Sequence, residues 1–310
     1  MSPSAASRKP TVLITGCSDG SLGAALAIAL SSTHRVFATA RDPNKLITTQ
    51  SAGVDILTLD VLSSTSITEC VSSISHLTGG SLDMLVNNAG STYFTALADI
   101  DTSKAKELFD LNVWAQLSVT QAFLPLLLAS KRDGGAIIVN HTSTSSLVAP
   151  PFTAMYAASK AALAIMTDAL RHELSPFGIN VVDLKTSSTF SNLNGNQVVG
   201  APAVPKGSLY WAARDWLNEL YTGEPFMKGA MGTEEWGKRV AKQLQKRKPN
   251  AQVWEGGFPW LMWFVTWLPN GVAQKLLADA AGMPRVTAEL KSYGVEKAVS
   301  EAYGTEVAKS

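Results

Sequence analysis

Residues 11–23 read TVLITGCSDGSLG, in which a short β-branched run passes through closely spaced glycines into a segment with helical periodicity. Leu22, Leu26 and Leu30 mark one face of that helix. Glycines at such a junction let the backbone approach a pyrophosphate, to which the helix N-terminus presents N–H donors. The stretch therefore predicts a dinucleotide-binding loop, with an ordinary tight turn as the alternative. The residues expected to contact the ligand are Gly16, Ser18, Gly20, Leu22 and Gly23.

The alternation of strand and helix patterns continues to residue 186. Apolar runs predict strands at 11–15, 35–39, 55–59, 84–87, 135–141 and 179–184. Helical patterns lie between them at 22–31, 66–77, 103–130 and 153–175, the second of which opens with a capping-box pattern from Ser66 to Glu69. Strands that are apolar throughout have both faces covered. The order predicts an α/β fold with a single doubly wound parallel sheet, a Rossmann fold, that binds ligands at the carboxyl ends of its strands.

The chain beyond residue 186 lacks this alternation. We expect residues 1–10 to be a flexible lead-in and residues 11–310 to form a single dinucleotide-binding catalytic domain. Within it, residues 186–250 form a substrate lid with helices at 209–221 and 233–248. Residues 251–310 form an apolar, helical C-terminal extension that opens with a short strand at 251–254.

Composition excludes several classes of protein. Lys and Arg number 26 against 25 Asp and Glu, and this formal charge of +1 gives no long-range attraction for nucleic acid. Cys17 and Cys70 have neither a C-x-x-C partner nor suitably spaced histidines, so no metal site is expected. The two cysteines and the lack of an apolar signal segment predict an intracellular, cytoplasmic protein.

The end of the second predicted strand bears on cofactor choice. An acidic residue at the position of Ala40 would accept the ribose 2′-OH of NAD, whereas Ala40 followed by Arg41 leaves room and a cation for the 2′-phosphate of NADP. The pattern predicts NADPH or NADP as cofactor, with Arg41 as a solvated surface charge as the alternative. Asp19 argues against a bound 2′-phosphate if its carboxylate points inward.

Three residues have the spacing of an acid–base site. Tyr156 and Lys160 are at i, i+4 on one helix face. An ammonium near the phenol is expected to lower the pKa of Tyr156 and make it a general acid/base near neutral pH. Ser143 follows the strand at 135–141. His141 could pair with Ser143, but no G-x-S-x-G elbow surrounds this serine, so a hydrolase is not expected.

These motifs, with Asn87–Gly90 (NNAG) after the fourth strand and Asn112 in the long helix, resemble the short-chain dehydrogenase/reductase family over residues 11 to about 192. The resemblance implies that Tyr156 protonates a substrate carbonyl as hydride arrives from the nicotinamide, while Ser143 orients that carbonyl. It also implies that Lys160 binds the ribose hydroxyls and lowers the pKa of Tyr156. Asn112 would hold a water that links Lys160 to solvent.

The resemblance implies further cofactor contacts. They are Asp60 and Val61 at the adenine, Asn88, Ala89 and Gly90 at the adenosine ribose, and Thr189 and Ser191 at the nicotinamide carboxamide. The family usually has Pro-Gly after the sixth strand, where this chain reads TSSTFS at 186–191. Loss of that fixed turn predicts either a looser lid or another turn built from small hydroxyl residues.

The glycine-rich opening, the run VFATARDPNKL and the tryptophan-rich tail resemble fungal reductases similar to NADPH-dependent 1-acyldihydroxyacetone-phosphate reductase, with 17β-hydroxysteroid-dehydrogenase-like relatives. The resemblance implies an NADPH-dependent reductase of an apolar ketone, such as an acyl-dihydroxyacetone-phosphate-like lipid or a fungal secondary metabolite. The alternatives are a non-catalytic NADP(H)-sensing protein and the reverse alcohol oxidation. Lys185 and Lys206 are candidates for a substrate phosphate, with surface lysines as the alternative. The family also implies a homodimer or homotetramer formed by helices 103–130 and 153–175.

Tryptophan is concentrated near the C-terminus, with seven of the eight residues at or after Trp211. Residues 258–268 form an apolar aromatic run that is shorter than the about 20 residues needed to span a bilayer. A basic stretch at 238–248 precedes it. The combination predicts peripheral contact with endoplasmic reticulum or lipid-droplet surfaces through Phe258 to Leu268. Packing of these aromatics on the core or on a dimer partner is the alternative.

Overall fold

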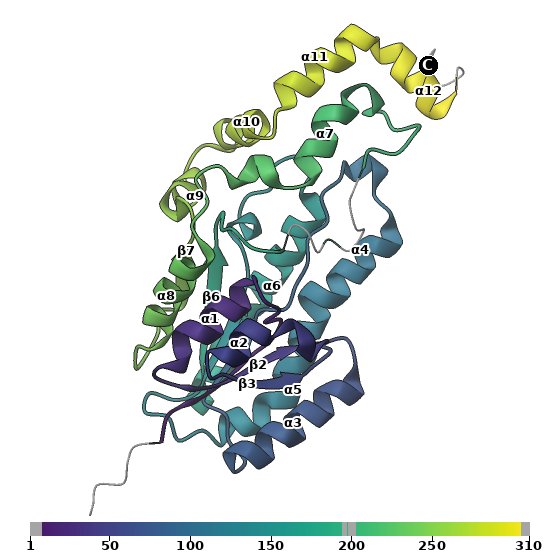
Figure 1. Ribbon diagram of the computed structural model, residues 1–310. Helices are drawn as coiled ribbons and strands as arrows, with labels where there is room; N and C mark the ends of the chain where they lie inside the picture. Colours follow the sequence, from purple (N-terminus) through teal and green to yellow (C-terminus); the bar gives the residue numbers. More distant parts are fainter. Residues whose placement is uncertain (1–7, 194–196, 198–202, 305–310) are drawn as a thin grey trace, which may run out of the picture.

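The computed structural model describes residues 8–193, 197 and 203–304. At the centre of this part of the chain lies a seven-stranded parallel sheet of order β3-β2-β1-β4-β5-β6-β7 (Figure 1). Its strands are β1 (Thr11–Ile14), β2 (Arg35–Ala40), β3 (Asp55–Thr58), β4 (Met84–Asn87), β5 (Ile137–His141), β6 (Asn180–Thr186) and β7 (Gln252–Glu255). The strand order reverses between β1 and β4, which confirms the predicted doubly wound α/β fold and places the ligand crevice there.

Helices cover both faces of the sheet. One face packs against α1 (Leu22–Ser31) and α8 (Thr233–Leu244), and the other packs against α3 (Ser64–Thr78), α5 (Ala115–Leu128) and α6 (Ala154–Leu174). A short helix, α2 (Ile47–Ser51), follows β2. Within β1, Val12 and Ile14 belong to the first core and Leu13 to the second. The strands are apolar throughout because both of their faces are buried.

The helix predicted at 103–130 is interrupted. It consists of α4 (Thr102–Phe109), a π-helical turn (Asp110–Trp114) and α5. The run 102–128 has the length and hydropathy of a membrane span, but half of its most apolar window is buried within the fold. The predicted capping box at Ser66 is wrong, because α3 begins one turn earlier with Ser63 as its N-cap, whose hydroxyl accepts from the Ser66 amide.

The C-terminal helices extend from one end of the sheet as an arm (Figure 1). They are α9 (Pro259–Val265), α10 (Asn270–Ala280), α11 (Met283–Tyr293) and α12 (Val295–Tyr303). Val286 of α11 packs against Leu217 and Leu220 of α7 (Arg214–Tyr221) in a third apolar cluster. The predicted helix at 209–221 is α-helical only over α7, and the one at 233–248 ends at Leu244. The strand predicted at 251–254 is confirmed as β7, so the C-terminal extension begins inside the sheet.

Candidate active site

The glycine-rich loop joins β1 to α1 at the switch point of the sheet. Gly16 and Gly20 have φ values of +70° and +79°, which favour glycine. A Cβ on Gly16 would lie 2.8 Å from the Cα of Ala89, and one on Gly23 would lie 2.5 Å from Asn88 Nδ2. The loop therefore packs backbone to backbone against the segment after β4, and the glycines make that approach possible.

A cavity of about 1900 Å³ runs from this loop to the other candidate site residues. All the positions predicted for the cofactor line it except Gly20 and Gly23, which shape the loop itself. The lining residues are Gly16, Ser18, Leu22, Arg41, Asp60, Val61, Asn88, Ala89, Gly90, Tyr156, Lys160, Thr189 and Ser191. A cavity of this size, opening onto the N-terminus of α1 and a glycine cradle, fits a dinucleotide.

The amide of Asn88 fixes the shape of the loop. Its Nδ2 donates to the carbonyl oxygens of Thr15 (2.8 Å) and Gly16 (2.9 Å), while the Thr15 hydroxyl accepts from the backbone amides of Asn88 and Ala89 at 2.9 Å. The Asn88 amide nitrogen, expected near the ribose, therefore already donates to the backbone of the loop. The side chain acts first as a brace for the cofactor loop.

Two cations line the cavity together with Asp60, the residue expected at the adenine. They are Arg41 and Lys45. The carboxylate of Asp19 accepts from the backbone amides of Thr48 (3.1 Å) and Thr49 (3.4 Å) at the start of α2. From the sequence, an inward-pointing Asp19 carboxylate would repel a bound 2′-phosphate. In the structure these hydrogen bonds hold the carboxylate at the start of α2 instead. Lys45 was missed from the sequence because its position depends on the short 3₁₀ turn after β2.

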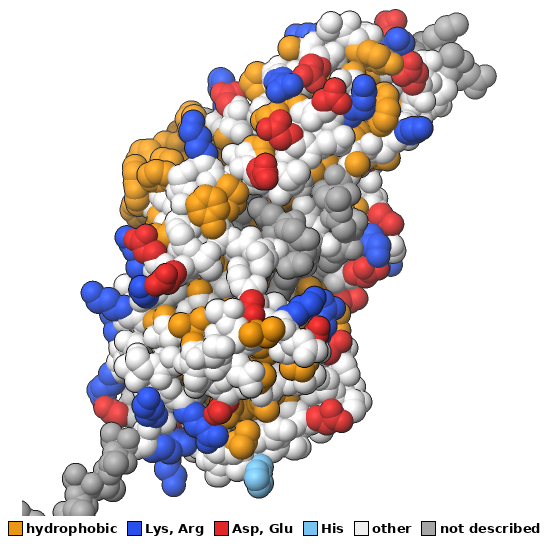
Figure 2. Space-filling model, in the orientation of Figure 1, with side chains coloured by type: hydrophobic (Ala, Val, Ile, Leu, Met, Phe, Trp, Pro, Cys, Tyr) orange, Lys and Arg blue, Asp and Glu red, His pale blue; other side chains and the backbone are white. Residues whose placement is uncertain are grey.

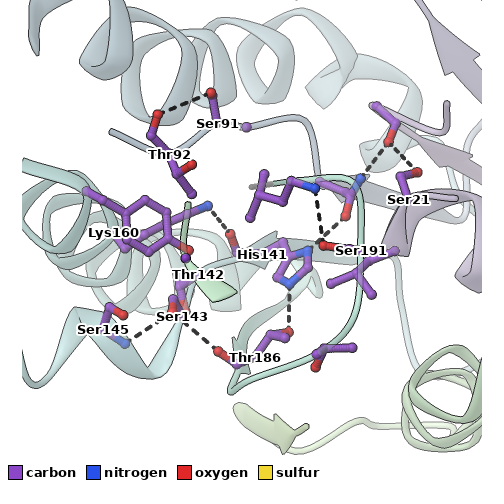
Figure 3. A pocket seen from close by; sticks show the side chains of 18 of the residues that line it. Ser21, Ser91, Thr92, His141, Thr142, Ser143, Ser145, Lys160, Thr186 and Ser191 are labelled. Atoms are coloured by element: carbon purple, nitrogen blue, oxygen red, sulfur yellow. Dashed lines mark hydrogen bonds between the residues drawn. The ribbon is translucent and has the colours of Figure 1, made fainter. Parts of the chain in front are cut away.

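Ser143, Tyr156 and Lys160 all line the cavity, Ser143 from the end of β5 and the other two from α6. Figure 3 shows Ser143 and Lys160 near one another in this cavity. The Ser143 hydroxyl lies close enough to the Tyr156 phenol to lower its pKa. Ser143 Oγ also donates to the Thr186 carbonyl at 3.3 Å and accepts from the Ser145 amide at 3.1 Å. Lys160 Nζ donates to the carbonyl oxygen of His141 at 2.8 Å.

The protonation of these groups departs from the sequence expectation. Burial raises the pKa of Tyr156, and the hydrogen bond from Ser143 only partly offsets this. Burial lowers the pKa of Lys160 to about 8, although the nearby Asp183 carboxylate favours the ammonium form. This direction is opposite to the expectation that Lys160 lowers the pKa of Tyr156, because the Lys160 ammonium donates to the His141 carbonyl and the phenol is desolvated.

Asn112 lies in the π-helical turn and is fully buried. Its Nδ2 donates to the Ser91 carbonyl and to the Ser159 hydroxyl, both at 3.0 Å, and its Oδ1 accepts from the Ser91 amide at 2.9 Å. The side chain thus joins α6 to the segment after β4. π-Turns often occur at functional sites, where they reorient the backbone.

The other end of the cavity is mostly apolar. It is lined by Phe94, Val148, Phe226, Met227, Phe258, Leu261 and Met262. Lys228 also lines the cavity. Neither lysine predicted for a substrate phosphate reaches it, because Lys185 is buried in an ion pair and the exposed Lys206 lies outside the lining.

Comparisons with known proteins agree with this geometry. Residues 10–198 match the model of the short chain dehydrogenase family. The chain belongs to this family. It is 42% identical over 287 residues to a short-chain dehydrogenase/reductase of Pestalotiopsis microspora, a match that covers 92% of this chain and 98% of that one. It is 33% identical to an NADPH-dependent 1-acyldihydroxyacetone phosphate reductase of Schizosaccharomyces pombe, over 79% of this chain and 85% of that one.

The fold is also found in solved structures. A short-chain dehydrogenase from Streptomyces avermitilis superimposes with a TM-score of 0.69 at 23% identity, over 93% of this chain and 97% of that one. The protein is thus a short-chain dehydrogenase/reductase enzyme, and members of this family use NAD(P) as cofactor.

In this short-chain dehydrogenase/reductase, hydrogen bonds replace the usual Pro-Gly turn after β6. The Ser187 amide donates to the Glu255 carbonyl at 2.9 Å, and the Ser187 hydroxyl donates to the Gly257 carbonyl at 2.7 Å. The Ser188 hydroxyl donates to the Phe226 carbonyl at 3.0 Å. Of the two alternatives for 186–191, the structure therefore has the hydroxyl-built turn. The buried Thr189 bonds within this turn through its hydroxyl.

The structural role of His141 could not be predicted from the sequence. Asn88 uses its amide nitrogen on the loop, so its Oδ1 accepts from His141 Nδ1 at 2.8 Å. The other ring nitrogen, Nε2, then accepts from the Thr186 hydroxyl at 2.6 Å, and Trp236 Nε1 donates to that hydroxyl at 3.2 Å. Burial, with the nearby Lys160 charge, lowers the pKa of His141 to about 3 and keeps the ring neutral. One tautomer thus links the cofactor loop to the end of β6.

A buried ion pair on β6 supports the residues around Ser143. Lys185 and Asp183 of β6 lie 2.5 Å apart with side-chain exposures of 2% and 0%. Asp183 accepts from the Thr142 hydroxyl, and Lys185 donates to the Ser146 hydroxyl at 3.2 Å. The pair therefore holds residues on both sides of Ser143.

The aromatic run forms an exposed apolar patch at α9, which we call the α9 patch (Figure 2). Its exposed members are Phe258, Trp260, Leu261, Trp263, Phe264 and Trp267. The basic stretch runs away from this patch along α8. Arg239 interacts with Glu255 at the end of β7, just before α9. Arg247 pairs with Asp133 just before β5, at the amino ends of the strands. Contact of the aromatic run with a membrane stays a prediction.

Proposed function

We propose that this enzyme is an NADPH-dependent reductase of apolar ketones. The observation that carries the proposal is the meeting of the Ser143 and Tyr156 hydroxyls between the glycine-rich loop and an apolar compartment of the same cavity. A carbonyl there would have two hydroxyl groups at its oxygen and room for a hydrocarbon body. The alternative of alcohol oxidation uses the same residues in reverse.

Tyr156 can serve as the proton donor of a reduction. Reduction needs a proton donor at the carbonyl oxygen, whereas oxidation needs a base. Burial raises the pKa of Tyr156, which favours the protonated phenol.

Each residue then has a distinct task. The bound nicotinamide supplies the hydride that reduces the carbonyl carbon. Tyr156 donates a proton to the carbonyl oxygen, and the Ser143 hydroxyl orients that oxygen. Lys160 provides an ammonium next to the site for the ribose hydroxyls and for restoring the Tyr156 proton. Asn112 holds α6 against the segment that carries Gly90, which fixes where Lys160 sits.

Arg41 and Lys45 support a preference for NADPH over NADH. Both line the cavity together with Asp60, where two cations would neutralise a 2′-phosphate. The similarity to the Schizosaccharomyces pombe enzyme, which is named as NADPH-dependent, points the same way. That enzyme's name also supports a lipid-like ketone as substrate, although a fungal secondary-metabolite ketone fits the apolar lining equally well.

The test is a substrate survey with purified enzyme. Absorbance at 340 nm follows NADPH or NADH oxidation with acyl-dihydroxyacetone phosphate, long-chain ketones, steroid ketones and aromatic polyketide ketones. The proposal expects turnover of at least one apolar ketone class, with higher kcat/KM for NADPH than for NADH. Tight NADPH binding without reduction of any of these substrates would favour the cofactor-sensing alternative.

A further inference from the structure

Thr92 has a buried hydroxyl group without a hydrogen-bond partner in the described part of the chain. Its side chain is 1% exposed, and Oγ1 is unpaired. Buried polar groups are almost always hydrogen-bonded, so an unpaired hydroxyl calls for an explanation. Thr92 also lines the cavity of the site, so a ligand there can supply the missing partner.

The segment Gly90–Phe94 places this hydroxyl beside the acid–base residues. A Cβ on Gly90 would lie 3.5 Å from Lys160 Nζ. The ring of Phe94 meets that of Tyr156 edge-on, with 6.0 Å between centroids. Thr92 lies between these two contacts on the same chain segment, and Figure 3 shows its side chain among those lining the cavity. Thr92 therefore belongs to the wall of the cavity that also carries Lys160 and Tyr156.

The residues between these positions are engaged elsewhere. The Ser91 amide donates to Asn112 Oδ1 at 2.9 Å, and the Tyr93 hydroxyl accepts from the Asp101 amide at 3.0 Å. Ser91 also lines the cavity, but both neighbours of Thr92 are tied to the surrounding scaffold by these bonds. The bonds on either side of Thr92 hold the segment that carries it.

We propose that Thr92 is a specificity-determining residue whose hydroxyl binds a second oxygen of the substrate. The inference rests on the proposed function and narrows it. Ser143 and Tyr156 bind the reacting carbonyl. The Thr92 hydroxyl binds a hydroxyl, acyloxy or oxo group on the carbon alpha or beta to that carbonyl. A threonine hydroxyl can both donate and accept, so it suits each of these groups. The preferred substrates are oxygenated apolar ketones and not simple ones.

A matched pair of ketones tests this proposal. We would measure kcat/KM with NADPH for 2-decanone and for 1-hydroxy-2-decanone, which differ by one hydroxyl group. Thr92→Val keeps the branched shape and removes the hydroxyl, whereas Thr92→Ser keeps the hydroxyl. Thr153→Val is the control, because Thr153 is also buried and lines the cavity, but its hydroxyl already donates to the Pro150 carbonyl at 2.7 Å.

The wild-type enzyme is expected to prefer the hydroxyketone by about 5-fold, the effect of one neutral hydrogen bond. Thr92→Val abolishes that preference by losing activity on the hydroxyketone alone, Thr92→Ser retains it, and Thr153→Val changes both substrates equally. An unchanged ratio in Thr92→Val, or a change confined to the KM for NADPH, overturns the role of Thr92. If Thr92→Val does not fold, Thr92→Ala applies the same criterion. Absence of turnover with both ketones in the wild type counts against the proposed function itself and removes this inference with it.

Discussion

The Lys185→Met substitution removes the ion-pair partner of the buried Asp183 carboxylate. The two groups lie 2.5 Å apart inside the sheet, and the carboxylate is 0% exposed. Breaking such a pair by removing one partner costs about 3–5 kcal/mol, because the remaining charge has lost its compensation. For a chain of 310 residues, the unfolding entropy converts this loss into a decrease in Tm of about 5–8 °C.

A surface ion pair of equal length provides the control. Lys238 and Glu234 also lie 2.5 Å apart, but their side chains are 68% and 83% exposed. Lys238→Met is therefore expected to cost less than about 1 kcal/mol. The double variant Asp183→Asn with Lys185→Met removes both charges and should recover most of the stability lost by Lys185→Met.

Thermal unfolding followed by circular dichroism gives the three Tm values. The reasoning predicts a large decrease for Lys185→Met, a small one for Lys238→Met and a substantial recovery in the double variant. Equal decreases for Lys185→Met and Lys238→Met would refute the claim that burial sets the energy of this pair. Because Lys185 also donates to Ser146, kcat is expected to fall in Lys185→Met even at temperatures where the variant is folded.

Four further predictions follow from the site and its surroundings. Arg41→Ala removes a cation that lines the cavity. It should raise the KM for NADPH about 10-fold, a loss within the range of a charge-assisted hydrogen bond, and leave the KM for NADH unchanged. Equal effects on the two KM values would contradict recognition of the 2′-phosphate by Arg41. Lys160 has a pKa of about 8 in the folded protein against 10.5 for the free side chain. Between these pH values the unfolded chain therefore holds more protons, and the free energy of unfolding should rise with pH by up to about 3 kcal/mol. Urea unfolding at several pH values should show this rise in the wild type and not in Lys160→Met. His141→Leu leaves Asn88 Oδ1 and the Thr186 hydroxyl without their ring partner and should weaken NADPH binding by about 10-fold in fluorescence titration, whereas His34→Leu, at a buried histidine outside the cavity, should leave it unchanged. Trp260→Ala with Trp263→Ala removes two exposed rings of the α9 patch and should abolish co-sedimentation with phosphatidylcholine liposomes; undiminished sedimentation would contradict a peripheral membrane contact and favour a protein partner at this surface.

The sheet could be predicted from the sequence because each strand is a short apolar run. The predicted strands match β1 to β7 to within two residues at either end. The continuous apolar character of β1 follows from burial on both faces, with Leu13 on one side and Val12 and Ile14 on the other. Helix interruptions could not be predicted in the same way. The π-turn at Asp110–Trp114 depends on the tertiary bonds of Asn112, which no local pattern records.

The site residues could be proposed from motifs, but their electrostatics could not. The i, i+4 spacing correctly places Tyr156 and Lys160 on one helix, yet it does not reveal that Lys160 turns toward the His141 carbonyl. Burial raises the pKa of Tyr156, opposite to the expected shift, and only Ser143 acts to lower it. The role of His141 depends on partners 53 and 45 residues away along the chain, Asn88 and Thr186. Such contacts become visible only once the strands are assembled.

The most direct test of the central claim follows the transferred hydride. NADPH deuterated at C4 of the nicotinamide, in each of its two stereoisomers, is incubated with the enzyme and an apolar ketone, and the alcohol is analysed by mass spectrometry. The account predicts deuterium on the carbinol carbon with one of the two isomers, and a large loss of product in Tyr156→Phe, which keeps the ring but removes the proton donor. Product without deuterium from either isomer, or undiminished product formation in Tyr156→Phe, would contradict it.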